Sequence, residues 1–372
     1  MTFLIVTSVQ HILQNGAYFA YAPYVREMNI WLKHVDKVII VAPINNQKVS
    51  PIHLQYQHKS LQFLPIDEFN IKTLKETIKT VFKIPKIAFK LFFAMKKANH
   101  IHLRCPGNVG LIGLLIQILF PSKTKTAKYA GNWDPKAKAN LSYRLQKYLL
   151  STTFLTKNMN VLVYGQWENQ TNNIKPFFTA SYLESDKEVL QKKELSEKIK
   201  IIFVGTLSVG KRPLYAIQVI EQLLKRNHEI EFSIYGEGSE RNLLEKYISK
   251  NSLAKNIFLK GNQTAENIKK AYQESHFMLL PSESEGWPKV VAEAMFWGCV
   301  PIATSVSCVP YMLDFGQRGL FLDIDLHNDT NTISGLFQSE KRFQEMMKNG
   351  VEWSRKYTLD YFEQDIKLLL QS

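Results

Sequence analysis

The chain has 372 residues, of which 45% are hydrophobic and 22% charged, and its formal net charge is +14. This length predicts two domains at roughly 150 residues each, and the composition excludes the disordered and collagen-like classes. The three cysteines, Cys105, Cys299 and Cys308, form no C-x-x-C pair, so they indicate neither a zinc site nor a disulfide framework.

The positive charge is concentrated in one half of the chain. Residues 1–150 hold 21 Lys+Arg and 6 Asp+Glu, whereas residues 151–372 hold 26 and 27. This asymmetry favours an anionic partner for the N-terminal half: a membrane surface, nucleic acid or a phosphorylated acceptor.

The longest apolar run, 109–120, is shorter than the roughly 20 residues that span a bilayer, and the start MTFLIVTSV lacks signal-peptide features. We therefore expect a cytoplasmic protein whose membrane contact is peripheral.

The N-terminal half alternates apolar segments with helical patterns. Gly16 is expected in a loop after the first strand. The predicted strands are 3–9, 38–42, 100–104 and 127–130, and the predicted helices are 19–35 and 109–120. This alternation is typical of a parallel sheet with helices on its faces.

The same alternation restarts after a polar segment at 165–198. Strands are predicted at 200–205, 256–261, 276–281 and 300–304, helices at 214–226 and 290–298, and a strand, Gly-x-Gly turn and helix at 231–248. We therefore expect an N-terminal domain over 1–180, a C-terminal domain over 181–352, and a final helix over 353–372 that can cross back to the N-terminal domain.

The segment PSESEGWPKVVAEAMFWGCVPIAT, residues 281–304, carries the clearest chemical pattern. Glu285 lies before a predicted helix and Glu293 inside it, eight positions later. The N–H groups at a helix start favour a diphosphate, and Gly286 lets the backbone approach it. Two carboxylates can accept hydrogen bonds from sugar and ribose hydroxyls. The segment therefore predicts a nucleotide-sugar site.

This segment resembles the E-x7-E signature of the retaining GT-B glycosyltransferases, the bacterial nucleotide-sugar-dependent group often called glycosyl transferases group 1. The matching residues are Glu285, Gly286, Pro288, Glu293, Ala294, Met295, Gly298, Pro301, Ile302, Ala303 and Thr304. The resemblance implies an α/β fold of the GT-B type, with two facing Rossmann-like domains and a cleft between them. It further implies that Glu285 contacts the donor sugar and Glu293 the ribose, with Trp287, Pro288, Lys289 and Val290 beside them.

Two upstream segments resemble the same family. VGTLSVGKRP resembles its strand and turn that supply cations to the donor diphosphate, so Lys211 and Arg212 are assigned that catalytic role. Thr206 stands where many members carry arginine, which leaves that contact in doubt. The remaining donor-site candidates are three glycines, Gly16, Gly236 and Gly238, although ordinary turns need such glycines too.

The resemblance is thinner in the N-terminal half. HIHLRCPGN makes His102 and Arg104 candidates for the acceptor cleft, and GNWDP adds Asn132, Trp133 and Asp134. Gly131 and Asn132 stand where many members have a histidine near the reacting sugar, so a histidine-assisted step is in doubt. A capping turn explains the same residues nearly as well.

The resemblance implies transfer with retention by front-face attack, catalysed by a hexosyltransferase that needs no metal or other cofactor. The donor is expected to be a UDP- or GDP-sugar, and the acceptor a glycan or lipid-linked hydroxyl in surface polysaccharide synthesis.

Lysines and phenylalanines are interleaved over 72–97, which favours an anionic membrane surface, although a core-facing helix with solvated lysines fits as well. The alternatives are a same-fold nucleotide-sugar epimerase and a basic nucleic-acid-binding protein; the pattern of a recognisable nucleic-acid module is missing, so no nucleic acid is expected.

Overall fold

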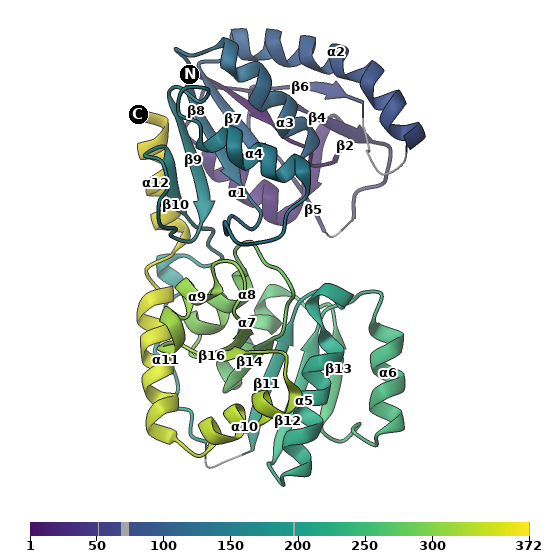
Figure 1. Cartoon of the computed structure of the whole chain (residues 1–372), viewed down its shortest axis with the longest axis vertical. Helices are drawn as coiled ribbons and strands as arrows, with labels where there is room; N and C mark the ends of the chain where they lie inside the picture. The colour runs from purple at the N-terminus through teal and green to yellow at the C-terminus, as the bar shows by residue number, and fades with distance from the viewer. Residues whose placement is uncertain (51, 68–73, 196–197, 372) are drawn as a thin grey trace. The chain divides into compact units, whose positions relative to one another are not determined.

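The computed structural model describes residues 1–50, 52–67, 74–195 and 198–371, and of residues 74–82 it describes only the backbone. The chain forms two compact units (Figure 1). Unit 1 comprises Met1–Thr179 together with Asp360–Ser372, and unit 2 comprises Ala180–Leu359.

Unit 1 is built on a parallel sheet in the order β6-β4-β1-β7-β8-β9-β10. Strands β1 and β4 are apolar on both faces, as expected for a sheet covered by helices on both sides, whereas β7 and β8 also carry buried histidine, threonine and lysine side chains. Their bounds are β1 Thr2–Val6, β4 Lys37–Asn45, β6 Leu61–Ile66, β7 His100–Cys105, β8 Thr124–Tyr129, β9 Met159–Tyr164 and β10 Ile174–Phe177.

A small hairpin extends one end of β4 and corrects one prediction. Strands β2 (His11–Gln14) and β3 (Ala17–Tyr21) pair antiparallel, and β5 (His53–Gln55) pairs with β3. The turn between them consists of Asn15 and Gly16, whose φ angles of 52° and 76° are those that a two-residue hairpin turn requires. The helix predicted over 19–35 therefore begins only at Ala22, as α1 (Ala22–Leu32).

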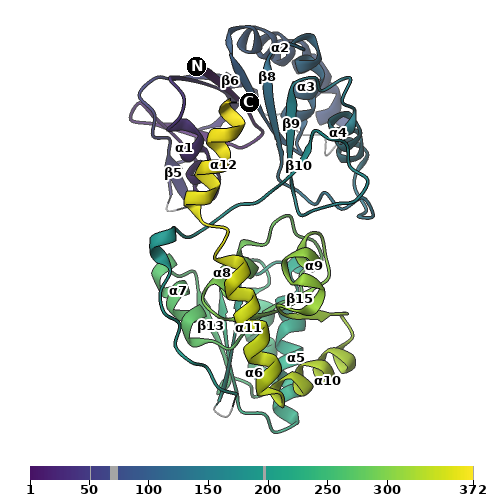
Figure 2. The same ribbon diagram turned by 90° about the vertical axis from the view of Figure 1, so that its left-hand side faces the viewer.

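Helices cover both faces of this sheet. Figure 2 shows α2, α3 and α4 along one face and α1 and α12 along the other. Their bounds are α2 Leu74–Lys97, α3 Asn108–Ile116 with the 3-10 turn η1 Gln117–Leu119, α4 Leu141–Ser151 and α12 Leu359–Gln371. Helix α12 packs on unit 1 through Phe362, whose ring centroid lies 5.3 Å from that of Phe177, and through an ion pair of Glu363 with Lys33 at 2.8 Å.

Unit 2 repeats the architecture with six parallel strands in the order β13-β12-β11-β14-β15-β16. The strands are β11 Ile199–Val204, β12 Ile230–Tyr235, β13 Ile257–Gly261, β14 Phe277–Leu280, β15 Val300–Thr304 and β16 Leu320–Leu322. The α-helices are α5 Pro213–Lys225, α6 Arg241–Lys250, α7 Ala265–Glu274, α8 Lys289–Phe296, α9 Val309–Met312, α10 Leu326–Phe337 and α11 Glu340–Ser354, and the 3-10 turns are η2 Glu184–Asp186, η3 Val209–Lys211 and η4 Asp314–Gly316. The predicted α/β class with two Rossmann-like sheets is confirmed.

One buried lysine holds the polar segment after Ala180 against unit 2. The Nζ of Lys193 donates to the carbonyls of Tyr272, Ser275, Trp297 and Gly298 at distances between 2.7 and 3.2 Å. These carbonyls lie at the carboxyl ends of α7 and α8, where the helix dipole favours a cation. The charged segment therefore has a structural partner despite its lack of periodicity.

Candidate functional site

The strand order of unit 2 creates a place for a ligand at the carboxyl ends of two strands. From β11 the chain runs outward through β12 and β13, and then crosses to β14 on the other side of β11. Loops that leave such a pair of strands diverge, and the crevice between them is where ligands bind in open α/β sheets. Here the loops are 205–212 and 281–288. They are joined by a hydrogen bond from the N–H of Glu283 to the carbonyl of Gly210 at 2.8 Å.

The two loops bring Lys211 and Glu285 together. The Nζ of Lys211 lies 2.5 Å from Oε1 of Glu285, and their side chains are 28% and 8% exposed. A carboxylate with so little solvent contact needs a cationic partner, which Lys211 supplies. The Lys211 side chain still reaches solvent, so it can meet an incoming anion.

Arg212 follows Lys211 at the start of α5. Its backbone is left-handed, with φ 49° and ψ 48°, and Pro213 follows as the first residue of the helix. The two consecutive cations thus precede a helix N-terminus, whose dipole also favours negative charge. Thr206 lies exposed earlier in the same loop. This loop therefore fits an anionic group.

Gly236 and Gly238 let the loop after β12 pack directly on the loop that carries Lys211. A Cβ at Gly236 would lie 1.9 Å from the carbonyl oxygen of Gly205, and one at Gly238 would lie 2.2 Å from that of Leu207. The N–H of Leu207 also donates to the carbonyl of Glu237 at 3.0 Å. Glycine is required at both positions for this contact, so the two glycines support the loop that carries Lys211.

Two residues that the sequence analysis did not single out hold Gly286 in place. Its carbonyl accepts hydrogen bonds from Ser307 Oγ at 3.2 Å and from Cys308 Sγ at 2.9 Å. Burial raises the pKa of the Cys308 thiol to about 12, so it stays protonated and remains a donor. Their position directly after the neighbouring strand β15 is the signal that could have identified them.

Helix α8 begins beside Glu285. Its first residue is Lys289, and Pro288 precedes it without a side-chain cap. The N–H of Val291 in the first turn donates to the carbonyl of Pro288 at 2.9 Å. The positive end of the helix dipole lies at this end of α8 and favours an anion there. Lys289 and Val290 are both half-buried there.

Trp287 has a different environment. It is buried, and its ring centroid lies 6.1 Å from that of Trp353 and 5.8 Å from that of Tyr357. The indole therefore anchors the loop in the interior of unit 2.

Glu293 already has partners within unit 2. Ser181 Oγ donates to its Oε1 at 2.5 Å, and the phenol of Tyr272 donates to its Oε2 at 3.4 Å. Glu285 is paired with Lys211 instead, so the two glutamates have separate protein partners. A ligand hydroxyl that reached Glu293 would exchange with the Ser181 hydroxyl.

The candidates from β7 in unit 1 lie in its interior. His102 is fully buried, and its Nδ1 lies 2.9 Å from Thr126 Oγ1. Burial lowers the pKa of His102 to about 3, so the ring is neutral. Arg104 lies 3.5 Å from the Glu27 carboxylate, and its guanidinium stacks 4.8 Å from the Tyr24 ring centroid.

The remaining candidates of unit 1 lie in turns. Gly16 is exposed at the tip of the β2–β3 hairpin, with nothing within 4 Å of an added Cβ. The Asn132 side chain accepts from the N–H of Asp134 at 2.9 Å, which is an ordinary turn contact. Trp133 is buried, and its Nε1 donates to Gln170 at 3.0 Å. Among these side chains, the structure brings neither His102 nor Trp133 to the surface of unit 1.

The described residues give no support for a metal centre, since no group of three or more His, Cys, Asp or Glu side chains within them is arranged to hold an ion. In the same part of the chain, no helix is long and apolar enough to cross a bilayer.

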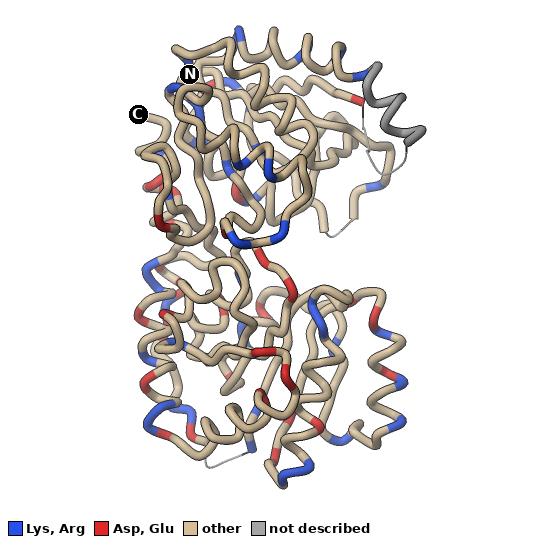
Figure 3. Tube along the Cα trace, in the orientation of Figure 1, with Lys and Arg blue, Asp and Glu red and all other residues tan. Residues whose placement is uncertain are grey.

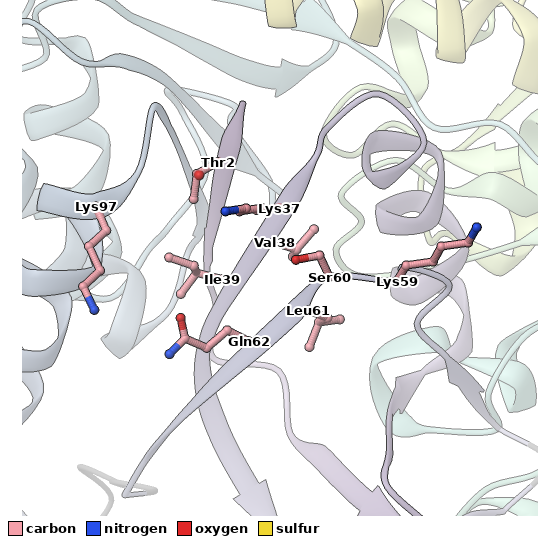
Figure 4. Close-up of a pocket in the computed structure, with 9 residues that line it drawn as sticks. All are labelled: Thr2, Lys37, Val38, Ile39, Lys59, Ser60, Leu61, Gln62 and Lys97. Atoms are coloured by element: carbon pink, nitrogen blue, oxygen red, sulfur yellow. The ribbon is translucent and has the colours of Figure 1, made fainter.

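A groove of about 380 Å³ lies in unit 1 at the start of its strands, opposite to the edge where ligands bind in such sheets (Figure 4). It is lined by Thr2, Lys37, Val38, Ile39, Lys59, Ser60, Leu61, Gln62 and Lys97.

Comparison with known sequences connects unit 2 to a family. The model of the family described as "Glycosyl transferases group 1" matches residues 185–352. The poly(glycerol-phosphate) alpha-glucosyltransferase of Bacillus subtilis is 25% identical over 191 residues, 49% of this chain and 27% of that protein. Protein CapJ of Staphylococcus aureus is 24% identical over 74% of this chain and 72% of its own length. The match thus spans only about a quarter of the Bacillus protein.

Comparison with solved structures supports the fold of the whole chain. Anabaena HepE in complex with UDP has a TM-score of 0.69 at 11% identity, covering 100% of this chain and 99% of that one. Sucrose-phosphate synthase from Thermosynechococcus elongatus has a TM-score of 0.65 at 15% identity, with coverages of 100% and 98%. TarM has a TM-score of 0.58 at 19% identity over 78% of this chain and 58% of that one. At these identities the likeness establishes the GT-B fold alone.

Proposed function

We propose that the chain is a member of the glycosyl transferases group 1 family, whose model matches residues 185–352, and that it is a retaining hexosyltransferase that uses a nucleotide-sugar donor. The observation that carries this proposal is the Lys211–Glu285 ion pair at the carboxyl ends of β11 and β14. The pair lies where an α/β sheet binds its ligand, and one of its members is a partly exposed cation.

The chemistry asked of this site is the stabilisation of a leaving diphosphate. When the bond between the anomeric carbon and the diphosphate oxygen breaks, negative charge grows on that oxygen. Lys211 and Arg212 are placed to stabilise this charge, and the N-termini of α5 and α8 add their helix dipoles. Glu285, once Lys211 turns to the diphosphate, is free to accept hydrogen bonds from sugar hydroxyls.

Retention follows if the acceptor attacks from the side that the diphosphate leaves. A bond forms between the acceptor oxygen and the anomeric carbon, and the acceptor proton passes to the departing phosphate oxygen. This route needs no protein nucleophile, and the products are the glycoside and a nucleoside diphosphate. The protein then contributes orientation and charge stabilisation.

We propose UDP as the first nucleotide to test, because UDP is bound in the HepE structure, and GDP as the second. The acceptor is proposed to be a hydroxyl of a glycan or lipid-linked polymer of the cell surface, by analogy with the poly(glycerol-phosphate) named for the Bacillus relative. The place of action is proposed to be the cytoplasmic side of the cell membrane, because the basic half of the chain would be attracted to its anionic lipids.

Thermal unfolding in the presence of UDP, GDP or a short DNA duplex tests the donor site. A nucleotide at a hundred times its Kd should stabilise the folded protein by about 2.7 kcal/mol, which a melting curve detects easily. Lys211→Met should remove most of this stabilisation. Lys225→Met is the matched control, because Lys225 is a 61% exposed lysine on α5 that pairs with Glu221.

Two outcomes would contradict the proposal. If neither nucleotide raises the melting temperature while the duplex does, the basic half is the binding surface and the protein binds nucleic acid. If a nucleotide-sugar is converted to another sugar nucleotide without an acceptor, the epimerase alternative is correct. The anomeric configuration of the first product, read by NMR, decides retention separately.

A further inference from the structure

The helices on one face of unit 1 carry large apolar side chains on their solvent side. We call α2, α3 with η1, α4 and the residues that follow α4 the outer helix layer; α2 contacts α3, and α3 contacts α4 (Figures 1 and 2). Its exposed apolar side chains are Ile84, Phe89, Phe93, Leu115, Leu119, Leu141, Tyr143, Leu145, Tyr148 and Phe154. Four of them are at least 65% exposed: Phe89 is 65%, Tyr148 67%, Phe154 75% and Leu141 81% exposed.

These side chains are not needed for the core of unit 1. The opposite sides of the same helices supply that core, through residues such as Leu91 and Met95 of α2, Leu114 of α3 and Leu149 and Leu150 of α4. A helix of a soluble domain usually has one apolar face and one polar face. Helices with a second, outward apolar set therefore indicate an apolar partner on the outside.

The stretch of chain from residue 83 to residue 158, which includes most of this layer, carries almost only positive charges. Residues 83–158 contain a single acid, Asp134. Their fourteen bases are Lys83, Lys86, Lys90, Lys96, Lys97, Arg104, Lys123, Lys125, Lys128, Lys136, Lys138, Arg144, Lys147 and Lys157. Lys125 and Lys128 are buried and Arg104 is half-buried, whereas others such as Lys86, Lys96, Lys136 and Arg144 are exposed. Figure 3 marks the positions of lysine and arginine along the backbone in blue.

We propose that the outer helix layer is a docking surface for an anionic phospholipid bilayer. Phenylalanine, leucine and tyrosine side chains would enter the boundary between headgroups and acyl chains, and the lysines would pair with the headgroup phosphates. Lysine stems can lie along apolar surface while their ammonium groups stay at the polar level. The surface therefore matches both parts of the bilayer boundary.

The bilayer explains these observations better than nucleic acid does. A nucleic acid would use the cations, but it offers no apolar phase for aliphatic side chains such as Leu141 and Leu119. Of the lysine-rich stretch 72–97, residues 72–73 and the side chains of 74–82, Phe82 among them, lie outside the described residues. The proposal therefore rests on residues 83–158. It deepens the membrane location proposed above and does not depend on the sugar transfer.

Co-sedimentation of the full chain with vesicles tests this docking surface. Wild-type protein should bind vesicles of phosphatidylcholine containing phosphatidylglycerol, should bind pure phosphatidylcholine less, and should lose affinity as salt rises. The double variant Phe89→Ser, Phe154→Ser should bind the mixed vesicles at least tenfold more weakly. The matched control is Leu243→Ser, Phe315→Ser in unit 2, where the side chains are 46% and 78% exposed. This control should bind like wild type.

Three results would overturn the proposal: wild-type protein that ignores the mixed vesicles, a Phe89→Ser, Phe154→Ser variant that binds them unchanged, or a self-association in sedimentation velocity that this variant abolishes. The last result would make a second copy of the chain the occupant of the surface. The melting shift by UDP, measured on the same variant, keeps the two proposals apart, because it reports on unit 2 alone.

Discussion

Units 1 and 2 share a strand order but use charge differently at the ends of their strands. Both sheets reverse direction beside their first strand, between β1 and β7 in unit 1 and between β11 and β14 in unit 2. In unit 2 the ion pair near this point keeps its lysine 28% exposed. In unit 1 the comparable charges are sealed: Lys128 lies 2.8 Å from Glu27, and their side chains are 1% and 6% exposed.

This difference indicates that strand order determines where a crevice forms. The exposure of the charged side chains beside the crevice then determines whether they can bind a ligand. The members of a buried ion pair cannot turn to a ligand. Such a pair can therefore serve only the structure of its own unit. A half-open pair can exchange its partner for an incoming anion. The loop after β1 in unit 1 instead carries the small Ser8, whose Oγ accepts from the N–H of Val109 at 3.3 Å.

The largest effect is expected from removing the sealed charge of unit 1. Glu27→Gln keeps the shape but leaves Lys128 and Arg104 without a buried anion, which should cost about 3–5 kcal/mol. Hydrogen exchange of amides in β7 and β8 measures the loss within unit 1. The control is Glu363→Gln, which breaks partly exposed contacts with Lys33 and His34 and should cost about 1 kcal/mol. Equal losses in both variants would remove the distinction between sealed and open pairs.

In unit 2 the open pair should matter for activity rather than for folding. Glu285→Gln should lower kcat/KM with a nucleotide-sugar donor about 100-fold, or about 2.7 kcal/mol of transition-state stabilisation. Glu283→Gln is the neighbouring control, since its side chain is exposed and its contact to Gly210 uses only the backbone. A variant at Glu285 with normal turnover would mean that the pair is structural, like that of unit 1.

The glycines behind the open pair should give a smaller effect. Gly236→Ala places a methyl group against the Gly205 carbonyl, so the two loops must separate at a cost of about 1–3 kcal/mol. Gly210→Ala, in the loop of Lys211 itself, meets nothing within 4 Å and is the control. Melting temperature and UDP affinity should both fall for the first variant only. An unchanged UDP affinity in Gly236→Ala would show that this contact does not shape the site.

The sequence was informative where one local pattern determines both conformation and chemistry. The apolar runs at 200–205 and 276–281 predicted strands β11 and β14. The motifs that follow these runs predicted that Lys211 and Glu285 belong to the donor site. That the two side chains meet depends on strand order, which local patterns do not specify. The donor-site roles of these residues stay predictions.

Prediction failed where a short signal competed with a longer one. The helical pattern over 19–35 concealed strand β3, although Asn15-Gly16 is a strong hairpin signal. The final helix predicted over 353–372 is interrupted, since α11 ends at Ser354 and α12 begins at Leu359. The inward direction of His102 and Trp133 depends on strand pleat and tertiary packing, which spacing alone does not reveal.

The buried histidines of unit 1 give the smallest and most specific test of the comparison. Burial lowers the pKa of His102 from 6.5 to about 3, so the folded state stays neutral while the unfolded chain takes up a proton below pH 6.5. The unfolded state therefore binds more protons, and the stability of unit 1 should fall by roughly 1 kcal/mol per pH unit for this histidine as pH decreases towards 3. His102→Gln should reduce that slope in hydrogen exchange of β7, whatever its effect at neutral pH. His327→Gln, at an exposed site of unit 2, should leave the slope unchanged. An unaltered slope in His102→Gln would mean that other groups, such as the carboxylates, govern the acid sensitivity of unit 1.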